Sequence, residues 1–113
     1  MSKDFKIEIK FNHFPQLAEK AHAAVSEIVR KAAFDVEGQA KTFVPIDTGA
    51  LHNSIDVQME GELTAMIAPH TEYSAFVEFG TSKMSAQPYM TPAAEAVRPA
   101  YVQALTQLES RLK

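Results

Sequence analysis

An apolar stripe of helical period, which runs from Pro15 to Phe43, constrains the fold of this chain more than any other feature. Apolar residues recur there at spacings of one, three and four, which places them along one side of an α-helix. Proline is tolerated in a first helical turn and cannot continue a helix, so Pro15 and Pro45 bound the segment. We therefore expect one helix over residues 15–43, about 40 Å long, which is more than the core of a small domain requires. The stripe comprises Leu17, Ala21, Ala24, Val25, Ile28, Val29, Ala32, Val36, Ala40 and Phe43.

Two residues of this segment depart from its pattern. Phe34 falls on the polar face, with Glu27, Arg30 and Lys41. A large aromatic side chain at that place indicates either a surface that a partner buries or a surface that the C-terminal segment covers. Gly38 costs a helix about 1 kcal/mol relative to alanine, so it marks a close contact or a bend.

Short strands are predicted on both sides of the helix. Residues 5–11 alternate between apolar and charged side chains, which is the pattern of a half-buried strand. Residues 54–59 and 63–68 are two further strands, joined by a hairpin turn at 60–62. Residues 70–80 fit both a helical turn and a strand, because both spacings are present.

A second helix is predicted over residues 92–112. Thr91 suits its N-cap, and Pro92 suits its first position. Pro99 removes one hydrogen bond, which predicts a kink near residues 95–98 or two abutting helices. Together the elements predict an α+β fold in one domain, residues 1–113. In this fold the long N-terminal helix packs on a small antiparallel sheet of three or four strands, with the C-terminal helix alongside.

Composition narrows the possible classes of function. The chain has 113 residues and a net charge of −3, which does not favour a sequence-independent grip on DNA. It has no cysteine, which excludes disulfides, thiol catalysis and zinc-thiolate sites. No secretory signal and no apolar run of about 20 residues occurs, so we expect a protein that is soluble in the cytosol or assembled there. No cofactor or metal is expected, because the histidines lack ligand spacing: His13, His22, His52 and His70.

The tripeptide Asp47-Thr48-Gly49 suggests an alternative function. It carries the catalytic aspartate of retroviral-type aspartic proteases, and a homodimer could supply one Asp47 from each chain to share a proton. Such an enzyme also needs flanking apolar strands and a glycine-rich flap, yet this chain has four glycines and a helix before the tripeptide. A structural interpretation fits better. The Asp47 carboxylate caps the next backbone amides, Gly49 takes a backbone angle closed to other residues, and residues 48–53 form one helical turn.

Two segments in order carry a resemblance to a known family. They are "VPIDTGALHNSI" at 44–55 and "YSAFVEFGTSKMSAQPYMTPA" at 73–93. After a long helix, this arrangement resembles the minor tail-component family of long-tailed bacteriophages and prophages. The residues that carry the match are Pro45, Asp47, Thr48, Gly49, Leu51, Ser54, Ile55, Tyr73, Val77, Glu78, Phe79, Gly80, Thr81, Gln87, Pro88, Tyr89, Pro92 and Ala93. Family proteins often have a basic residue where this chain has His52.

The resemblance implies a structural, non-enzymatic virion protein that joins head to tail or completes the tail, as part of a ring at the neck. Its implied partners are other copies of itself, in a ring such as a hexamer, and adjacent neck and tail proteins. It implies no membrane, no sequence-specific nucleic acid and no small-molecule substrate. The implied location is the virion, with the host bacterial cytoplasm as the place of assembly.

Physical roles can be assigned to several of these residues. Five are expected to anchor the sheet on the long helix, and Gly80 to take a special backbone angle. Glu78 lies in an apolar segment, so its carboxylate should be paired or bonded to backbone amides, and we expect it to fasten either the 45–52 or the 81–90 loop. A plain solvated glutamate is the alternative. The five anchors are Leu51, Ile55, Tyr73, Val77 and Phe79.

The loop 81–90 is the segment expected to contact neighbouring subunits, through Met84, Tyr89 and Met90. The alternative is a disordered surface loop. A closed ring needs two different patches on each subunit, and Phe34 and this loop are the candidates.

Overall fold

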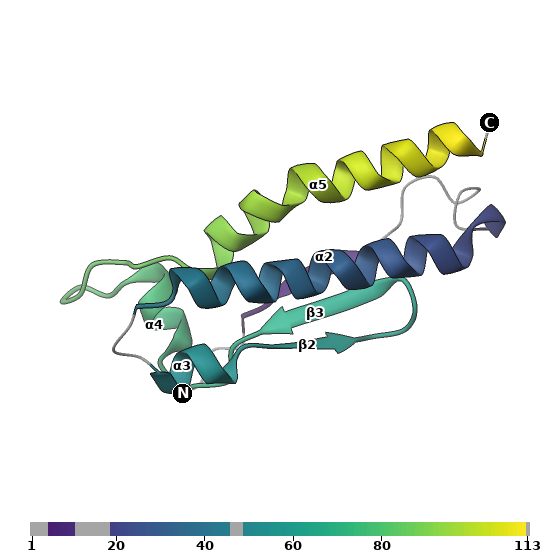
Figure 1. Ribbon diagram of the computed structural model, residues 1–113. Helices are drawn as coiled ribbons and strands as arrows, with labels where there is room; N and C mark the ends of the chain where they lie inside the picture. Colours follow the sequence, from purple (N-terminus) through teal and green to yellow (C-terminus); the bar gives the residue numbers. More distant parts are fainter. Residues whose placement is uncertain (1–4, 11–18, 46–48, 113) are drawn as a thin grey trace.

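A computed structural model describes residues 5–10, 19–45 and 49–112 of the chain. Figure 1 shows two long helices that lie side by side, with a small sheet against one of them and two short helices at one end. The α+β prediction is confirmed. The elements in order are β1 (Ile7–Lys10), α2 (His22–Phe43), α3 (Gly49–Ser54), β2 (Asp56–Met59), β3 (Thr64–Ala68), α4 (Ser74–Phe79) and α5 (Met90–Arg111).

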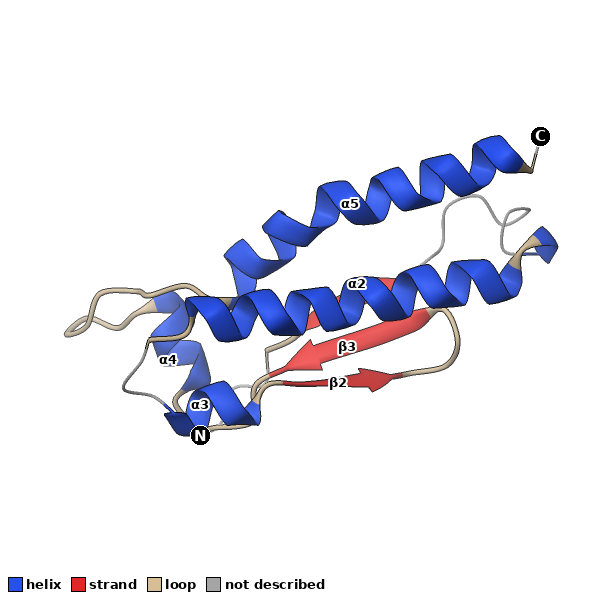
Figure 2. Ribbon diagram, viewed as in Figure 1, coloured by secondary structure: helices blue, strands red, loops and turns tan. Residues whose placement is uncertain are grey.

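The three strands form one antiparallel sheet in the order β1-β3-β2 (Figure 2). Ile67 of β3 lies opposite Ile7 on one side and Val57 on the other. These residues share the face that packs on α2, and the alternate residues face outward. The predicted strands and the hairpin between the second and third are confirmed, with slightly narrower bounds.

Helix α2 covers most of the predicted long helix, but it begins at His22, because its N-cap residue Ala21 has a non-helical backbone, with φ −141° and ψ 45°. The prediction of one unbroken helix is therefore wrong at Ala21. The predicted start at Pro15 lies outside the described residues. The helix ends at Phe43 because Pro45 restricts Val44 to an extended conformation, with φ −62° and ψ 135°. Gly38 marks no close contact, since a Cβ there would meet nothing within 4 Å.

Helix α5 starts two residues before the predicted position and packs along α2. Thr91 is therefore not the N-cap. Tyr89 occupies that position, and its side chain makes no capping hydrogen bond. Pro99 lies inside one continuous helix, so the alternative of two abutting helices is wrong.

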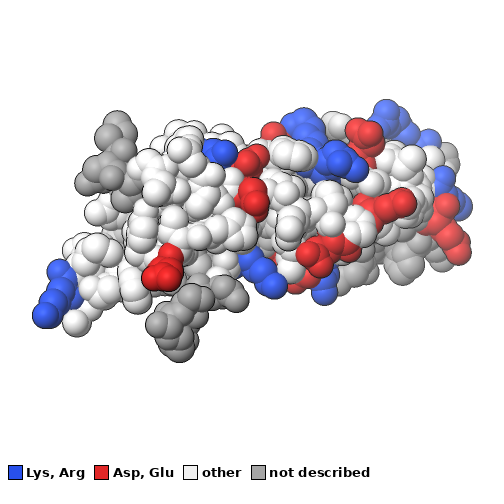
Figure 3. Space-filling model, turned by 90° about the horizontal axis from the view of Figure 1, so that it is seen from below, with Lys and Arg blue, Asp and Glu red and all other residues white. Residues whose placement is uncertain are grey.

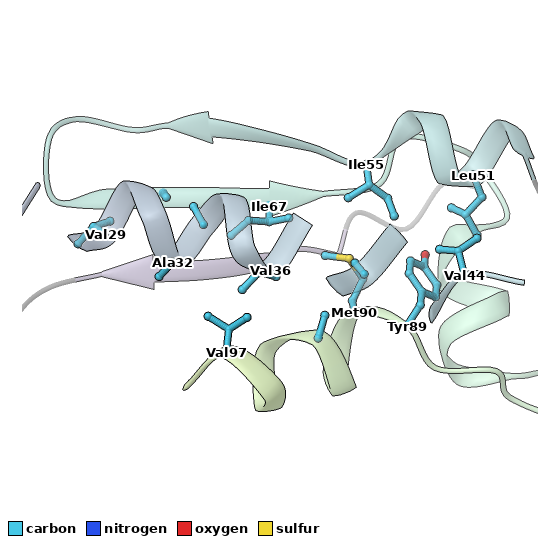
Figure 4. Packing of buried hydrophobic residues seen from close by; sticks show 14 of the residues in the cluster. Val29, Ala32, Val36, Val44, Leu51, Ile55, Ile67, Tyr89, Met90 and Val97 are labelled. Carbon is cyan, nitrogen blue, oxygen red and sulfur yellow. The ribbon is translucent and has the colours of Figure 1, made fainter. Parts of the chain in front are cut away.

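The core lies between α2, the inner face of the sheet and the first turns of α5 (Figure 4). Leu51 and Ile55 close it at the end where α3 meets the sheet, and both are buried as predicted. Each side chain of this size stabilises the fold by about 1.5–3 kcal/mol when fully buried. None of the helices in the described part of the chain is long and apolar enough to cross a membrane.

The two short helices settle the remaining predictions for this region. Residues 49–54 form α3, in line with the predicted helical turn, and residues 74–79 form α4, so the helical alternative holds for that segment. Gly49 does not take a left-handed backbone angle, and nothing lies within 4 Å of a Cβ built there. The role predicted for its missing side chain is therefore wrong.

Candidate assembly surface

Residues 80–89 connect α4 to α5 as a projecting loop at one end of the molecule (Figure 1). Side chains 81–88 are all exposed. The backbone folds back on itself, because the Thr81 amide donates to the Met84 carbonyl at 2.8 Å and the Met84 amide donates in return at 3.3 Å. The Gln87 amide then donates to the Val77 carbonyl at 2.7 Å, which returns the chain to α4. The loop is thus ordered by hydrogen bonds within it and to α4.

Gly80 makes the first turn of this loop possible. Its φ of 77° and ψ of 174° lie in a region that other residues scarcely adopt. A Cβ at this position would lie 2.7 Å from the Ala86 nitrogen and 2.9 Å from the Met84 oxygen. The special backbone angle predicted for Gly80 is confirmed.

Glu78 fastens the far end of the loop. It is 2% exposed, and its Oε1 accepts hydrogen bonds from the backbone amides of Tyr89 at 3.0 Å and Met90 at 2.8 Å. Its Oε2 accepts one from Thr91 at 3.0 Å. These residues begin α5, and the next one, Pro92, has no amide hydrogen. One carboxylate therefore satisfies every free donor of this helix N-terminus, where its negative charge also suits the helix dipole.

Tyr89 and Met90 are fully buried, so the prediction that they contact neighbouring subunits is wrong. Their amides are held by Glu78, which turns both side chains into the core (Figure 4). The Tyr89 hydroxyl donates to the Ser74 carbonyl at 3.0 Å. Burial of this hydroxyl raises the pKa of Tyr89, and the charge of Glu78 raises it further.

The end of the molecule that carries the loop also exposes large apolar side chains. Tyr73, Phe76 and Phe79 of the α4 segment are 37%, 48% and 65% exposed, and Met84 in the loop is 40% exposed. Tyr73 and Phe79 were expected to anchor the core, and that expectation is wrong. Because the segment is a helix, Ser74, Val77 and Glu78 face inward and the aromatic residues face outward.

Few charges accompany these apolar side chains. Figure 3 shows that charged side chains gather along the rest of the lower face, whereas the end with α3 and α4 is mostly uncharged. Phe43, the last residue of α2, is 43% exposed although its spacing predicted burial. Exposed apolar groups gathered at one end of a small protein are typical of an interaction surface. We call Phe43, Tyr73, Phe76, Phe79 and Met84 the apolar end.

Phe34 is 50% exposed on α2. Helix α5 packs along α2 but leaves the Phe34 side chain exposed, so the alternative that the C-terminal segment covers it is wrong. Phe34 therefore stays a candidate for contact with a partner.

The described residues hold no group of three or more histidine, aspartate or glutamate side chains that could bind a metal ion. Three histidines have polar neighbours instead: His22 lies by Glu62, His52 by Asn53 and His70 by Asp56. Asp47 and Thr48 lie outside the described residues. Gly49 begins α3, and the described element that precedes it is the helix α2 rather than a strand.

Ser54 joins α3 to the segment that follows β3. Its hydroxyl donates to the Leu51 carbonyl at 2.9 Å and accepts from the His70 amide at 3.0 Å. The sequence pattern placed Ser54 in the motif but assigned it no role, because its partner lies 16 residues away. Ser74 and Phe76 were missed for a similar reason. Their inward and outward positions follow only once the segment is taken as a helix.

Comparison with known proteins gives one match to a family model. The model is described as "Bacteriophage HK97-gp10, putative tail-component" and matches residues 11–80, more than half of the chain. The matched region runs through α2, the β2–β3 hairpin and α4, and it stops where the projecting loop begins. No curated protein and no solved structure matches the chain.

Proposed function

We propose that this chain, which belongs to the HK97-gp10-like family of bacteriophage tail components, is a structural subunit of the neck. In this proposal it joins head to tail or completes the tail of a long-tailed phage or prophage, as one member of a closed ring. It acts through packing between subunits, without catalysis, cofactor or metal. The whole chain, residues 1–113, acts as one domain that is assembled in the host cytoplasm and retained in the virion.

The observation that carries the proposal beyond the family is the apolar end beside a loop that the core holds in place. A surface that must recognise a neighbour benefits from order before binding, because less conformational entropy is then lost. Glu78 and Gly80 supply that order here. The proposal assigns the apolar end and Phe34 to contacts within the neck, with neighbouring subunits or with adjacent neck proteins.

The test is to locate the chain in purified particles by mass spectrometry and cryo-electron microscopy. Deletion of its gene should leave heads and tails unjoined, and the wild-type chain should appear at the neck. A particle that lacks the chain would refute the proposal.

Surface variants then test the two patches. Phe76→Ser, Met84→Ser and Phe34→Ser should lower the free energy of unfolding by no more than about 1.5 kcal/mol, because about half of each side chain is already exposed. Each should lower incorporation into particles, whereas Gln107→Ser, at an exposed position near the C-terminal end of α5, should not. Normal incorporation of all three variants would show that neither the apolar end nor Phe34 is a contact surface in the particle.

The homodimeric aspartic protease using Asp47 is not proposed, because no observation on the described residues favours it. Asp47→Asn provides a direct comparison. It should leave particle assembly intact, and no peptide cleavage should depend on Asp47.

A further inference from the structure

Both edges of the three-stranded sheet are open in the described chain. β3 lies in the middle, so β1 and β2 each have one side that pairs with no other strand. An open edge presents unpaired amide and carbonyl groups to another strand. Both edge strands run antiparallel to β3, so they point in the same direction. A copy of the subunit placed beside the first would therefore bring its β2 parallel to β1.

The outward face of the sheet carries opposite charges at its two edges. One row across the sheet runs from Lys10 through Thr64 toward Glu60, whose amide donates to the Thr64 carbonyl. Another row ends at Asp56, opposite Ala68 on β3. On the β1 side, Lys6 precedes the strand on the same outward face. The β1 edge is thus basic at both ends and the β2 edge acidic at both ends.

The middle residues of the two edges are also compatible. Glu8 and Gln58 lie on opposite sides of Met66. If β2 of one copy lay beside β1 of another in this register, Asp56 would meet Lys6, Gln58 would meet Glu8, and Glu60 would meet Lys10. Opposite charges that lie next to each other across strands stabilise pairing, and like charges oppose it.

The inward faces of the two edges are also compatible. Ile7 and Ile9 of β1 and Val57 and Met59 of β2 are only partly buried, although they pack against the core. A groove of about 460 Å³ lies between β1 and α5, and its lining is mostly apolar. Val57 and Met59 of a neighbouring copy would extend the apolar layer into this groove, and burying such side chains contributes about 25 cal/mol per Å².

We propose that the β2 edge of one copy pairs with the β1 edge of the next, which extends the sheet from subunit to subunit and fills the groove beside α5. The contact uses a different patch on each partner, so it is the head-to-tail type that closes into rings. It rests on the proposed ring at the neck and supplies the main-chain contact between its subunits.

The contacts already present at these edges leave room for the pairing. Lys10 lies 3.7 Å from Glu8, and Asp56 lies 2.8 Å from the ring of His70. Both are exposed pairs, which contribute little and can rearrange. The Tyr101 hydroxyl donates to the Lys10 carbonyl at 3.3 Å, so it covers one edge acceptor at the end of β1.

Disulfide cross-linking in assembled particles tests the register. The chain has no cysteine, so a variant with Glu8→Cys and Gln58→Cys carries only these two thiols. Within one subunit they are two strand spacings apart, about 10 Å, which is beyond the reach of a disulfide. Across the proposed interface they are neighbours at about 5 Å. Oxidised particles should therefore give a ladder of covalent multimers of this chain on a non-reducing gel.

The matched control combines Glu8→Cys with Gln39→Cys, an exposed position on α2 rather than on the sheet, and should give no ladder. Particles that contain the Glu8/Gln58 variant without cross-links overturn the edge pairing and leave the neck assignment standing. Cross-links to a protein other than this chain overturn it too. If wild-type particles lack the chain, the proposed function and the pairing fail together.

Charge reversal tests the edge pairing independently, including the case in which the cysteine variant does not enter particles. Lys10→Glu and Glu60→Lys should each lower incorporation by about threefold or more, because each places like charges side by side. The double variant restores opposite charges in the reverse order and should return to within about twofold of wild type. A double variant that is as poor as the product of the two single effects contradicts the pairing.

Discussion

Replacement of Glu78 by alanine is the sharpest test of how this fold presents its assembly surface. The change removes the acceptor for three backbone amides at the start of α5. Two of these amides belong to fully buried residues, Tyr89 and Met90, and water cannot readily replace the carboxylate there. The fold would then hold two buried donors without partners.

The expected cost follows from those contacts. A buried donor left unpaired costs about 1–3 kcal/mol, so two of them cost about 2–6 kcal/mol. Removal of a buried charge from water-free surroundings offsets part of this, and we expect Glu78→Ala to lower the free energy of unfolding by about 2–4 kcal/mol. Whole domains of this kind have about 5–15 kcal/mol in total, so the effect is large.

Two further variants make the reasoning specific. Glu78→Gln keeps one acceptor oxygen for Tyr89 and Met90 but turns an amide group toward the Thr91 amide, so it should cost about 1–2 kcal/mol. Glu72→Ala, an exposed glutamate just before α4, should stay within about 0.5 kcal/mol of wild type. Urea unfolding followed by circular dichroism at 25 °C measures all three. If Glu78→Ala costs no more than Glu72→Ala, the capping role is wrong.

The remaining predictions concern Gly80 and Tyr89. Gly80→Ala should destabilise the fold by about 3 kcal/mol or more, because it adds an atom 2.7 Å from Ala86 in a backbone region reserved for glycine. Gly38→Ala should instead stabilise the fold by about 0.5–1 kcal/mol, because the position lies within a helix and has open space for a methyl group. If thermal melts show that both substitutions raise or both lower the melting temperature, this reasoning is wrong. Tyr89→Phe should cost about 1–2 kcal/mol at pH 7, since it removes the buried hydrogen bond from the Tyr89 hydroxyl to the Ser74 carbonyl. Burial raises the pKa of Tyr89 in the folded state, so the unfolded state loses this proton first and wild-type stability should fall as pH rises above about 10. Thermal melts at stepped pH should show a shallower fall of stability for Tyr89→Phe. The same slope in both proteins would contradict the assignment.

Periodicity predicted the parts of this fold that depend on local pattern. The apolar stripe of α2 and the alternation in the strands follow from neighbouring residues, and both kinds of element formed, although the helix is interrupted at Ala21. Leu51, Ile55 and Val77 were placed correctly in the core, because their spacing fits the elements that carry them.

The residues that were misplaced depended on one ambiguous segment. Taken as a strand, residues 73–79 put Tyr73, Val77 and Phe79 on one face, which favoured a shared core role. The helix separates them, so Val77 points inward and Phe79 outward. Tyr89 and Met90 were misplaced because the segment before α5 was taken as free loop. Their burial depends on Glu78, which lies 11 and 12 residues earlier in the chain, and no local pattern reports such a contact.

The position of these features along the molecule bears on how the proposed ring could use them. The molecule measures 54 × 23 × 22 Å; the sheet edges lie along its length and the projecting loop lies at one end (Figure 1). Copies joined edge to edge would stand side by side and leave the apolar end of each subunit on one rim of the ring. The rim is where an adjacent neck protein would bind. Glu78 then serves assembly indirectly, because it fixes the loop at that rim to the same helix whose flank forms the groove beside β1. A variant that loosens the cap should therefore impair both contacts, whereas a variant at the loop tip should impair the rim alone.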